Sequence, residues 1–85
     1  MKIELSFSKH ALERLSSRGI SKSLVAQTIE APDSVINQTE CKQVYHKVFQ
    51  EGRNMKMLRV FVNHCKDPIL VITAYKTTKI DKYEH

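Results

Sequence analysis

The chain has 85 residues, of which 41% are hydrophobic and 27% are charged. This length predicts one domain, and the balance excludes a disordered chain. Fourteen Lys and Arg against nine Asp and Glu give a formal net charge of +5, which favours anionic partners such as nucleic acid, an acidic protein or a membrane surface. We expect a single domain over residues 1–85, with a core at about 2–78 and a tail at 79–85.

Hydropathy and cysteine usage predict a cytoplasmic protein that does not bind a membrane. The longest apolar run, at 69–75, is too short to span a bilayer, and no leader pattern follows Met1. Cys41 and Cys65 are isolated, without a CxxC pattern or the paired spacing of a zinc site, and we expect both thiols to stay reduced. No cofactor and no metal is expected, although scattered His and Cys residues could supply ligands, namely His46, His64 and Cys65.

The beginning of the chain predicts a strand followed by a helix. Apolar and polar residues alternate in KIELSF, which is the pattern of a half-buried strand over Lys2–Phe7. Ser8 is suited to the N-cap of a helix that runs to about Ser17, and Gly19 can adopt the left-handed conformation that closes it.

A second helix is predicted in KSLVAQTIEA, with Ser21 as its cap and Pro32 just beyond its end. Four runs rich in β-branched and aromatic residues then predict strands: SVINQ, KQVYHKVFQ, MKMLRVFVN and PILVITAYKT. The last run is the most apolar, so we expect it in the centre of the sheet. The connections EGRN and NHCKD are typical of hairpin turns. The sequence therefore predicts an α+β domain of order β-α-α-β-β-β(-β), with two helices packed on a mostly antiparallel sheet of four to five strands.

The first predicted helix carries three basic groups in one stripe. His10, Arg14 and Arg18 recur at every fourth residue, so they lie almost above one another at about 100° per residue. A neighbouring stripe is apolar and comprises Ala11, Leu12 and Leu15. The basic stripe is therefore expected at the rim of the contact between helix and sheet. It is either a solvated helix face or a set of groups for one anionic ligand.

A phosphodiester is the ligand that suits such a stripe. Arginine offers a rigid fork of donors that stays charged, and histidine can take or give a proton near neutrality. Cleavage of RNA by its own 2′-hydroxyl requires a base, an acid and cationic stabilisation, and no metal.

The predicted strands contain further candidate residues, each with two interpretations. Thr73 and Tyr75 share one face of the last strand and are either packing residues or groups of a site. Arg59 lies in an apolar strand and is either an edge residue or a second phosphate contact. Tyr45 and His46 are adjacent in a strand and point to opposite faces, so at most one of them enters a given site.

The segments FSKHALERLSSRGIS, IEAPDSVI and VITAYK together resemble a small bacterial domain family of unknown function. Its members begin with an H-x-x-x-R-x-x-x-R-x-I helix, continue through a Pro-Asp turn and end on a strand close to VxTxY. The family is grouped with the barnase, EndoU, colicin and RelE-like toxins, which are metal-independent ribonucleases. The resemblance covers the chain from about Phe7 to Lys76.

This resemblance implies a RelE- or barnase-like fold and a metal-independent endoribonuclease toxin of a bacterial toxin–antitoxin pair. The implied catalytic residues are His10, Arg14 and Tyr75, and the implied phosphate-binding residues are Arg18, Arg59, Thr73 and Lys76. RNA and a cognate antitoxin are the expected partners, with a homodimer as a further expectation. The alternative is a non-catalytic RNA- or protein-binding module of the same fold.

Overall fold

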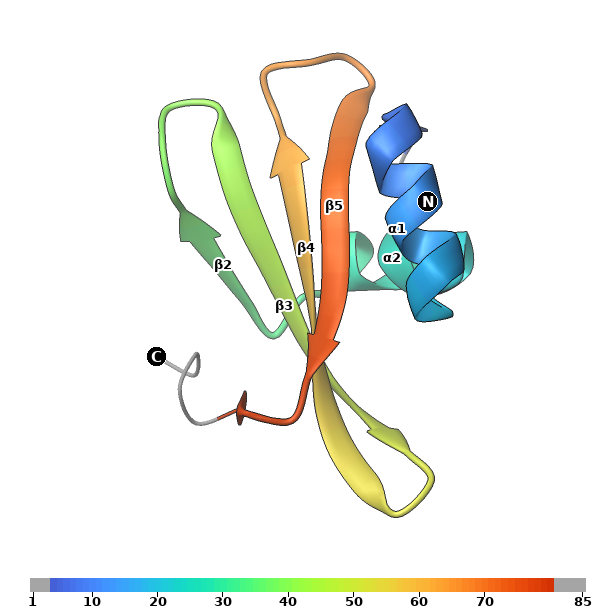
Figure 1. The fold of residues 1–85 in the computed structure, drawn as a ribbon. Coiled ribbons are helices and arrows are strands. Elements are labelled where there is room, and N and C mark those ends of the chain that lie inside the picture. The colour runs from blue at the N-terminus through green and yellow to red at the C-terminus, as the bar shows by residue number, and fades with distance from the viewer. Residues whose placement is uncertain (1–3, 81–85) are drawn as a thin grey trace.

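Residues 4–80 are described by a computed structural model, in which two helices pack on a five-stranded mixed sheet (Figure 1). The elements in chain order are β1 (Leu5–Phe7), α1 (Lys9–Arg18), α2 (Lys22–Glu30), β2 (Ser34–Asn37), β3 (Lys42–Glu51), β4 (Asn54–Asn63) and β5 (Ile69–Thr77). The predicted α+β class and element order are confirmed. The first two residues of the predicted strand at Lys2–Phe7 and most of the predicted tail lie outside the described residues.

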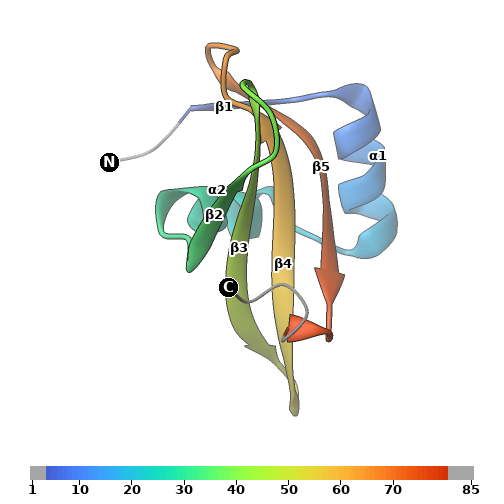
Figure 2. The same cartoon turned by 90° about the vertical axis from the view of Figure 1, so that its left-hand side faces the viewer.

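The strands are ordered β1-β5-β4-β3-β2. β1 pairs with β5 in parallel, and the other neighbours pair antiparallel, as the hairpin turns predict. The apolar strand β5 lies inside the sheet, but the middle strand is β4. β1 pairs only with the start of β5, at 69–71, so the later part of β5 runs beside α1 (Figure 1). The hairpin of β3 and β4 extends well beyond the end of β5 (Figures 1 and 2).

Capping residues define both helices as the sequence predicts. Ser8 precedes α1 and its hydroxyl oxygen accepts a hydrogen bond from the amide of Ala11 at 3.0 Å. Gly19 closes α1 with a φ of 64°, a left-handed conformation that glycine adopts without steric cost. Ser21 caps α2 in the same way, through the amide of Leu24 at 3.0 Å. Neither described helix is long and apolar enough to cross a membrane.

The core lies between the helices and one face of the sheet. Its buried residues come from α1, α2 and the segment between them, and from β4 and β5: Ala11, Leu15, Ile20, Val25, Ile29, Leu58, Val60, Val62, Val71 and Ala74. Leu12, which was predicted in the buried stripe of α1, is 39% exposed. Because α1 packs mainly against one strand, β5, its buried face is narrow and comprises Ala11 and Leu15.

A β-bulge in β5 decides which of its side chains face the helices. The register between β4 and β5 shifts by one residue, which leaves Ile72 without a direct partner on β4. Val71 and Ala74 are therefore both in the helix-side core, although they lie three positions apart. Because side chains alternate along a strand, this shift places Thr73 and Tyr75 on the face opposite the helices.

Cys41 and Cys65 form a disulfide, so the prediction of two reduced thiols is wrong. Cys41 lies just before β3 and Cys65 just after β4, and the amide of His64 donates to the carbonyl of Cys41 at 2.8 Å. The pairing of β3 and β4 thus brings together two cysteines that are 24 residues apart in sequence. Disulfides are typical of oxidising compartments, and this removes the thiol-based argument for a cytoplasmic location.

Candidate functional site

Four polar side chains form a row across the sheet, on the face opposite the helices. The row, which we call the sheet row, comprises Ser34 on β2, His46 on β3, Arg59 on β4 and Tyr75 on β5. Each member is the direct cross-strand partner of the next. Arg59 Nε donates to His46 Nε2 at 3.0 Å, and Arg59 Nη1 donates to the hydroxyl of Tyr75. On the other side of the imidazole, His46 Nδ1 and Ser34 Oγ are 3.2 Å apart. The sheet row is therefore continuous over four strands.

His46 is the buried centre of the sheet row, with none of its surface exposed. Burial, and then the nearby charge of Arg59, lower the pKa of His46 from its ordinary value of 6.5, so the ring is neutral at pH 7. An arginine nitrogen can only donate, so Nε2 must be the unprotonated acceptor and Nδ1 must carry the hydrogen. His46 therefore donates from Nδ1 to Ser34 Oγ and accepts at Nε2 from Arg59.

Arg59 lies against two aromatic rings of the same face. Its guanidinium carbon is 5.1 Å from the centroid of Phe61 and 5.4 Å from that of Tyr75. The two rings are stacked, with their centroids 5.9 Å apart and their planes at 22°. All three side chains are half-buried. The hydrogen bonds and the rings together hold the guanidinium in a defined orientation, which favours recognition of a planar or tetrahedral anion.

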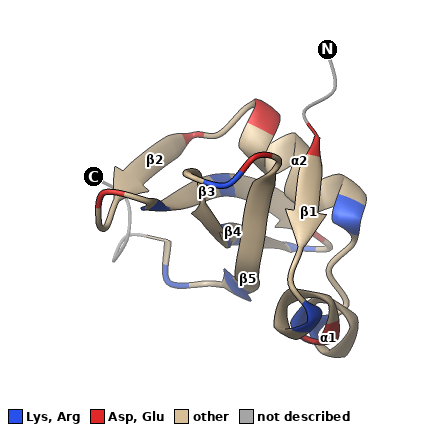
Figure 3. Cartoon of the chain, turned by 90° about the horizontal axis from the view of Figure 1, so that it is seen from above, with Lys and Arg blue, Asp and Glu red and all other residues tan. Residues whose placement is uncertain are grey.

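The basic stripe of α1, which we call the helix row, comprises His10, Arg14 and Arg18, and all three residues are exposed. Arg14 Nε donates to His10 Nε2 at 3.3 Å, one helical turn away. Arg18 Nη1 donates to the carbonyl of Ala74 at 2.8 Å, on the edge of β5 that runs beside α1. Seen from above, α1 lies at the end of the sheet away from β2 (Figure 3).

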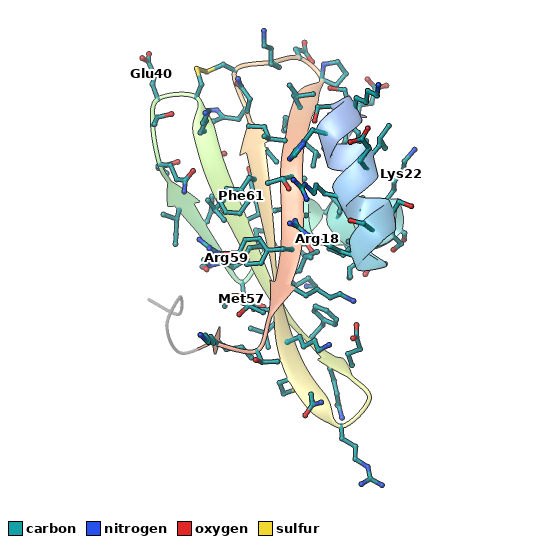
Figure 4. All side chains as sticks on the ribbon, in the orientation of Figure 1. Arg18, Lys22, Glu40, Met57, Arg59 and Phe61 are labelled. Carbon is teal, nitrogen blue, oxygen red and sulfur yellow. A yellow bond between two sulfur atoms is a disulfide. The ribbon has the colours of Figure 1, made fainter. Side chains whose placement is uncertain are left out.

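The structure divides the predicted site residues between two places. Arg59, Thr73 and Tyr75 share the face of the sheet row, whereas the hydrogen bonds of the helix row run within α1 and to the edge of β5. Figure 4 shows Arg18 on the α1 side of β5, and Arg59 and Phe61 on the other side.

Lys76, a predicted phosphate contact, is engaged in an ion pair. It faces the same side of β5 as Ala74, and its Nζ lies 2.9 Å from Oε2 of Glu51. Hydrogen bonds from Lys56 and then from Lys76 lower the pKa of Glu51, so this carboxylate stays ionised. Lys76 shares this single carboxylate with Lys56, and it lacks the rigid fork of donors that makes Arg59 better suited to bind phosphate.

His46 was not predicted as a site residue, although the sequence contains a signal for it. The EGRN turn pairs Glu51 with Asn54. In an antiparallel hairpin, the positions of paired residues have a constant sum, so the same register places His46 opposite Arg59. Counting back from a two-residue turn at Gly52 would therefore have joined the two residues.

The residues from which a metal site could be assembled do not come together. His46 lies in the sheet row, whereas Cys65 is bonded to Cys41 beyond the end of β4. Within residues 4–80, no group of three or more His, Cys, Asp or Glu side chains is placed to hold a metal ion.

A family model described as a domain of unknown function, DUF4258, matches residues 7–76. The chain belongs to the DUF4258 family. The segment matched by DUF4258 contains the whole helix row and the whole sheet row. No curated protein and no solved structure matches the chain. The predicted resemblance to a family of unknown function is thus confirmed over the range that the motifs indicated.

Proposed function

We propose that this protein is a metal-independent endoribonuclease of the toxin type, with the sheet row as the place where the reacting phosphate binds. The observation that supports this most strongly is the fixed guanidinium of Arg59, which is bonded to His46 and Tyr75. A rigid, permanently charged fork beside a hydroxyl group suits a phosphodiester in its ground state and in its transition state.

The proposed reaction is attack by the 2′-hydroxyl of RNA on the adjacent phosphorus. The P–O5′ bond breaks, and the products are a 2′,3′-cyclic phosphate and a 5′-hydroxyl. A base accepts the proton of the 2′-hydroxyl, and an acid donates a proton to the departing O5′. Negative charge builds up on the phosphate oxygens, and Arg59 is the group proposed to stabilise it.

Tyr75 and His10 are the proposed proton-transfer groups. The hydroxyl of Tyr75 contacts Arg59 directly, so it adjoins the proposed phosphate position. His10 remains a predicted acid or base on the helix row, where its Nε2 accepts from Arg14. His46 is not assigned to proton transfer, since both of its ring nitrogens are engaged within the sheet row.

Apart from His10, the helix row is proposed to bind RNA outside the reacting position. Arg14 is exposed and can reach a phosphate without losing a contact to the sheet. Arg18 already binds the carbonyl of Ala74, which favours a role in attaching α1 to β5. Thr73 shares the face of Tyr75 and is the second hydroxyl proposed to contact RNA.

The toxin assignment carries further proposals about partners and location. A toxin of this kind acts on RNA in the cytoplasm and is inhibited by a cognate antitoxin, with a homodimer as a further proposed state. The support for these proposals is the grouping of the resembled family with RelE-like and barnase-like toxins.

The decisive experiment follows a fluorescent single-stranded RNA incubated with the purified protein in EDTA. We expect cleavage to products that end in a 2′,3′-cyclic phosphate, and no cleavage of the same sequence made as DNA. The variant Arg59→Lys keeps the charge but loses the planar guanidinium with its fixed N–H donors, and we expect its rate of cleavage to fall about 100-fold. Arg53→Lys is the matched control, because Arg53 is exposed in the turn between β3 and β4.

Other outcomes would overturn defined parts of the proposal. A full rate in Arg59→Lys would remove the sheet row from the chemistry. Loss of all cleavage in a folded His10→Ala protein, with Arg59→Lys still active, would place the chemistry on the helix row. Binding of RNA by the wild type without any turnover would replace the enzyme with the non-catalytic RNA-binding module.

A further inference from the structure

We propose that His46 is a positioning residue that holds Arg59 in its working orientation while the imidazole is neutral, and that protonation of His46 releases the arginine. The consequence for cleavage rests on the proposed function. The consequence for the arginine itself does not, since it concerns only the sheet row.

The orientation of the His46 ring is set by β2. His46 is fully buried, and its backbone carbonyl accepts from the amide of Asp33 at 2.8 Å. Its Nδ1 is 3.2 Å from Ser34 Oγ, so the ring is also held at Nδ1, while Nε2 on its other side contacts Arg59. With the backbone and the far side of the ring both anchored, Nε2 presents its lone pair in one direction only.

This lone pair defines the direction of Arg59. Its Nε donates to His46 Nε2 at 3.0 Å, and its Nη1 donates to the hydroxyl of Tyr75, so two atoms of the guanidinium are bonded to different strands. Two bonds to one planar group determine its plane. Removing the bond at Nε would take away the one of these two bonds that orients the guanidinium towards β3.

A proton on His46 Nε2 removes this acceptor. The imidazolium can then only donate at that position, and its charge lies next to the charge of Arg59. Attraction between Arg59 and the ring is thereby replaced by repulsion at hydrogen-bond distance. Burial of His46 adds to this, because a charge without water is costly.

Among residues 4–80, charged and titratable groups lie near His46 on its own strand and on both sides of it. Arg59 faces the ring from β4, with Tyr75 beyond it on β5. Asp33 precedes β2, and its carboxylate accepts from a β3 amide at 2.6 Å. On β3 itself, Lys47 donates to a backbone carbonyl at 2.9 Å. Arg59 is the member of this set that is bonded to the ring, so it is the group that responds first to protonation.

The test compares two replacements of His46. His46→Gln offers an amide oxygen near the position of Nε2 and does not titrate, whereas His46→Phe keeps the size of the ring and has no acceptor. His64→Gln is the control, since His64 is an exposed histidine in the connection between β4 and β5. Thermal unfolding of each variant shows that it is folded before the other measurements are made.

The first readout is the pH profile of kcat for RNA cleavage. We expect kcat of the wild type and of His64→Gln to fall in acid with uptake of one proton more than kcat of His46→Gln, whose residue 46 does not titrate. We expect His46→Phe to be slower by tenfold or more at pH 7, because a misplaced Arg59 stabilises the phosphate poorly. An unchanged kcat in folded His46→Phe would overturn the proposal.

The second readout does not depend on activity. In the ¹⁵N spectrum of the protein without RNA, the Nε–H signal of Arg59 should be protected from exchange and should be lost as His46 takes up its proton. In His46→Gln the signal should persist through the same pH range. If the wild type does not cleave RNA but shows this behaviour, the proposed function fails and the positioning role stands. If the Arg59 signal does not change while His46 titrates, the positioning role is wrong.

Discussion

The helix row and the sheet row both combine histidine and arginine, but different interactions hold them in place. The helix row follows from the helical period alone, and its three side chains are exposed. The sheet row is assembled from four strands, and its central histidine is fully buried. Exposed cations attract RNA without orienting it, whereas a cation held by buried partners is oriented before the ligand arrives. The comparison indicates that the number of basic groups in a stripe is a weaker sign of chemistry than the bonds that hold them.

The disulfide affects the two rows differently, and its removal should have the largest effect on stability. It joins the ends of β3 and β4, the strands that carry His46 and Arg59, whereas α1 contains no cysteine. The double variant Cys41→Ser and Cys65→Ser should lower the free energy of unfolding by about 3 kcal/mol, since the bridge closes a loop of 24 residues.

Chemical denaturation measures this loss, and hydrogen exchange locates it. Amides of β3 and β4 should lose more protection than those of α1 in the double serine variant. Equal loss in all elements would contradict the expected difference between the two rows.

The two arginines of the helix row should differ in their effect on folding. Arg18→Ala removes the charged donor to the carbonyl of Ala74 and should cost about 1 kcal/mol of unfolding free energy. Arg14→Ala removes an exposed side chain bonded only weakly, to His10, and should change stability by less than about 0.5 kcal/mol. Thermal unfolding of the two variants side by side checks this order, and a larger loss in Arg14→Ala would show that the helix row is attached differently.

The protein should lose stability in acid because His46, in the sheet row, takes up a proton on unfolding. The pKa of His46 is lower in the folded protein than its ordinary value of 6.5, so the unfolded chain binds the proton more readily. The free energy of unfolding should therefore keep its full value above the ordinary pKa of 6.5, decline as the pH falls through 6.5, and level off below the pKa of His46 in the folded protein. Urea titrations at several pH values measure the slope. His46→Gln should flatten it.

The smallest expected effect is on RNA affinity through the helix row. Arg14→Ala should weaken binding only a few-fold and reduce the slope of log affinity against log salt by about 1, as expected for one phosphate contact. Fluorescence anisotropy over a salt series measures both quantities. A slope equal to that of the wild type would show that Arg14 does not contact RNA phosphate.

Local sequence patterns were sufficient to predict the fold class and one of the two rows, the helix row. Alternation and capping predicted both helices and most strand positions, because each depends on residues only a few positions apart. The helix row was predicted for the same reason. The pairing of His46 with Arg59 could also have been predicted from the turn at Gly52, once the two neighbouring runs were taken as one hairpin.

The amino-acid sequence was thus enough to predict the element order, the helix caps and the position of the basic stripe, since these follow from short-range periodicity and backbone preference. Tertiary structure alone decided two further features. The bulge at Ile72 moved Tyr75 to the face of Arg59, and α1 left Leu12 exposed. Each depends on the register of one strand against another or on the width of a packed face, and these are set by contacts between residues that are distant in the chain.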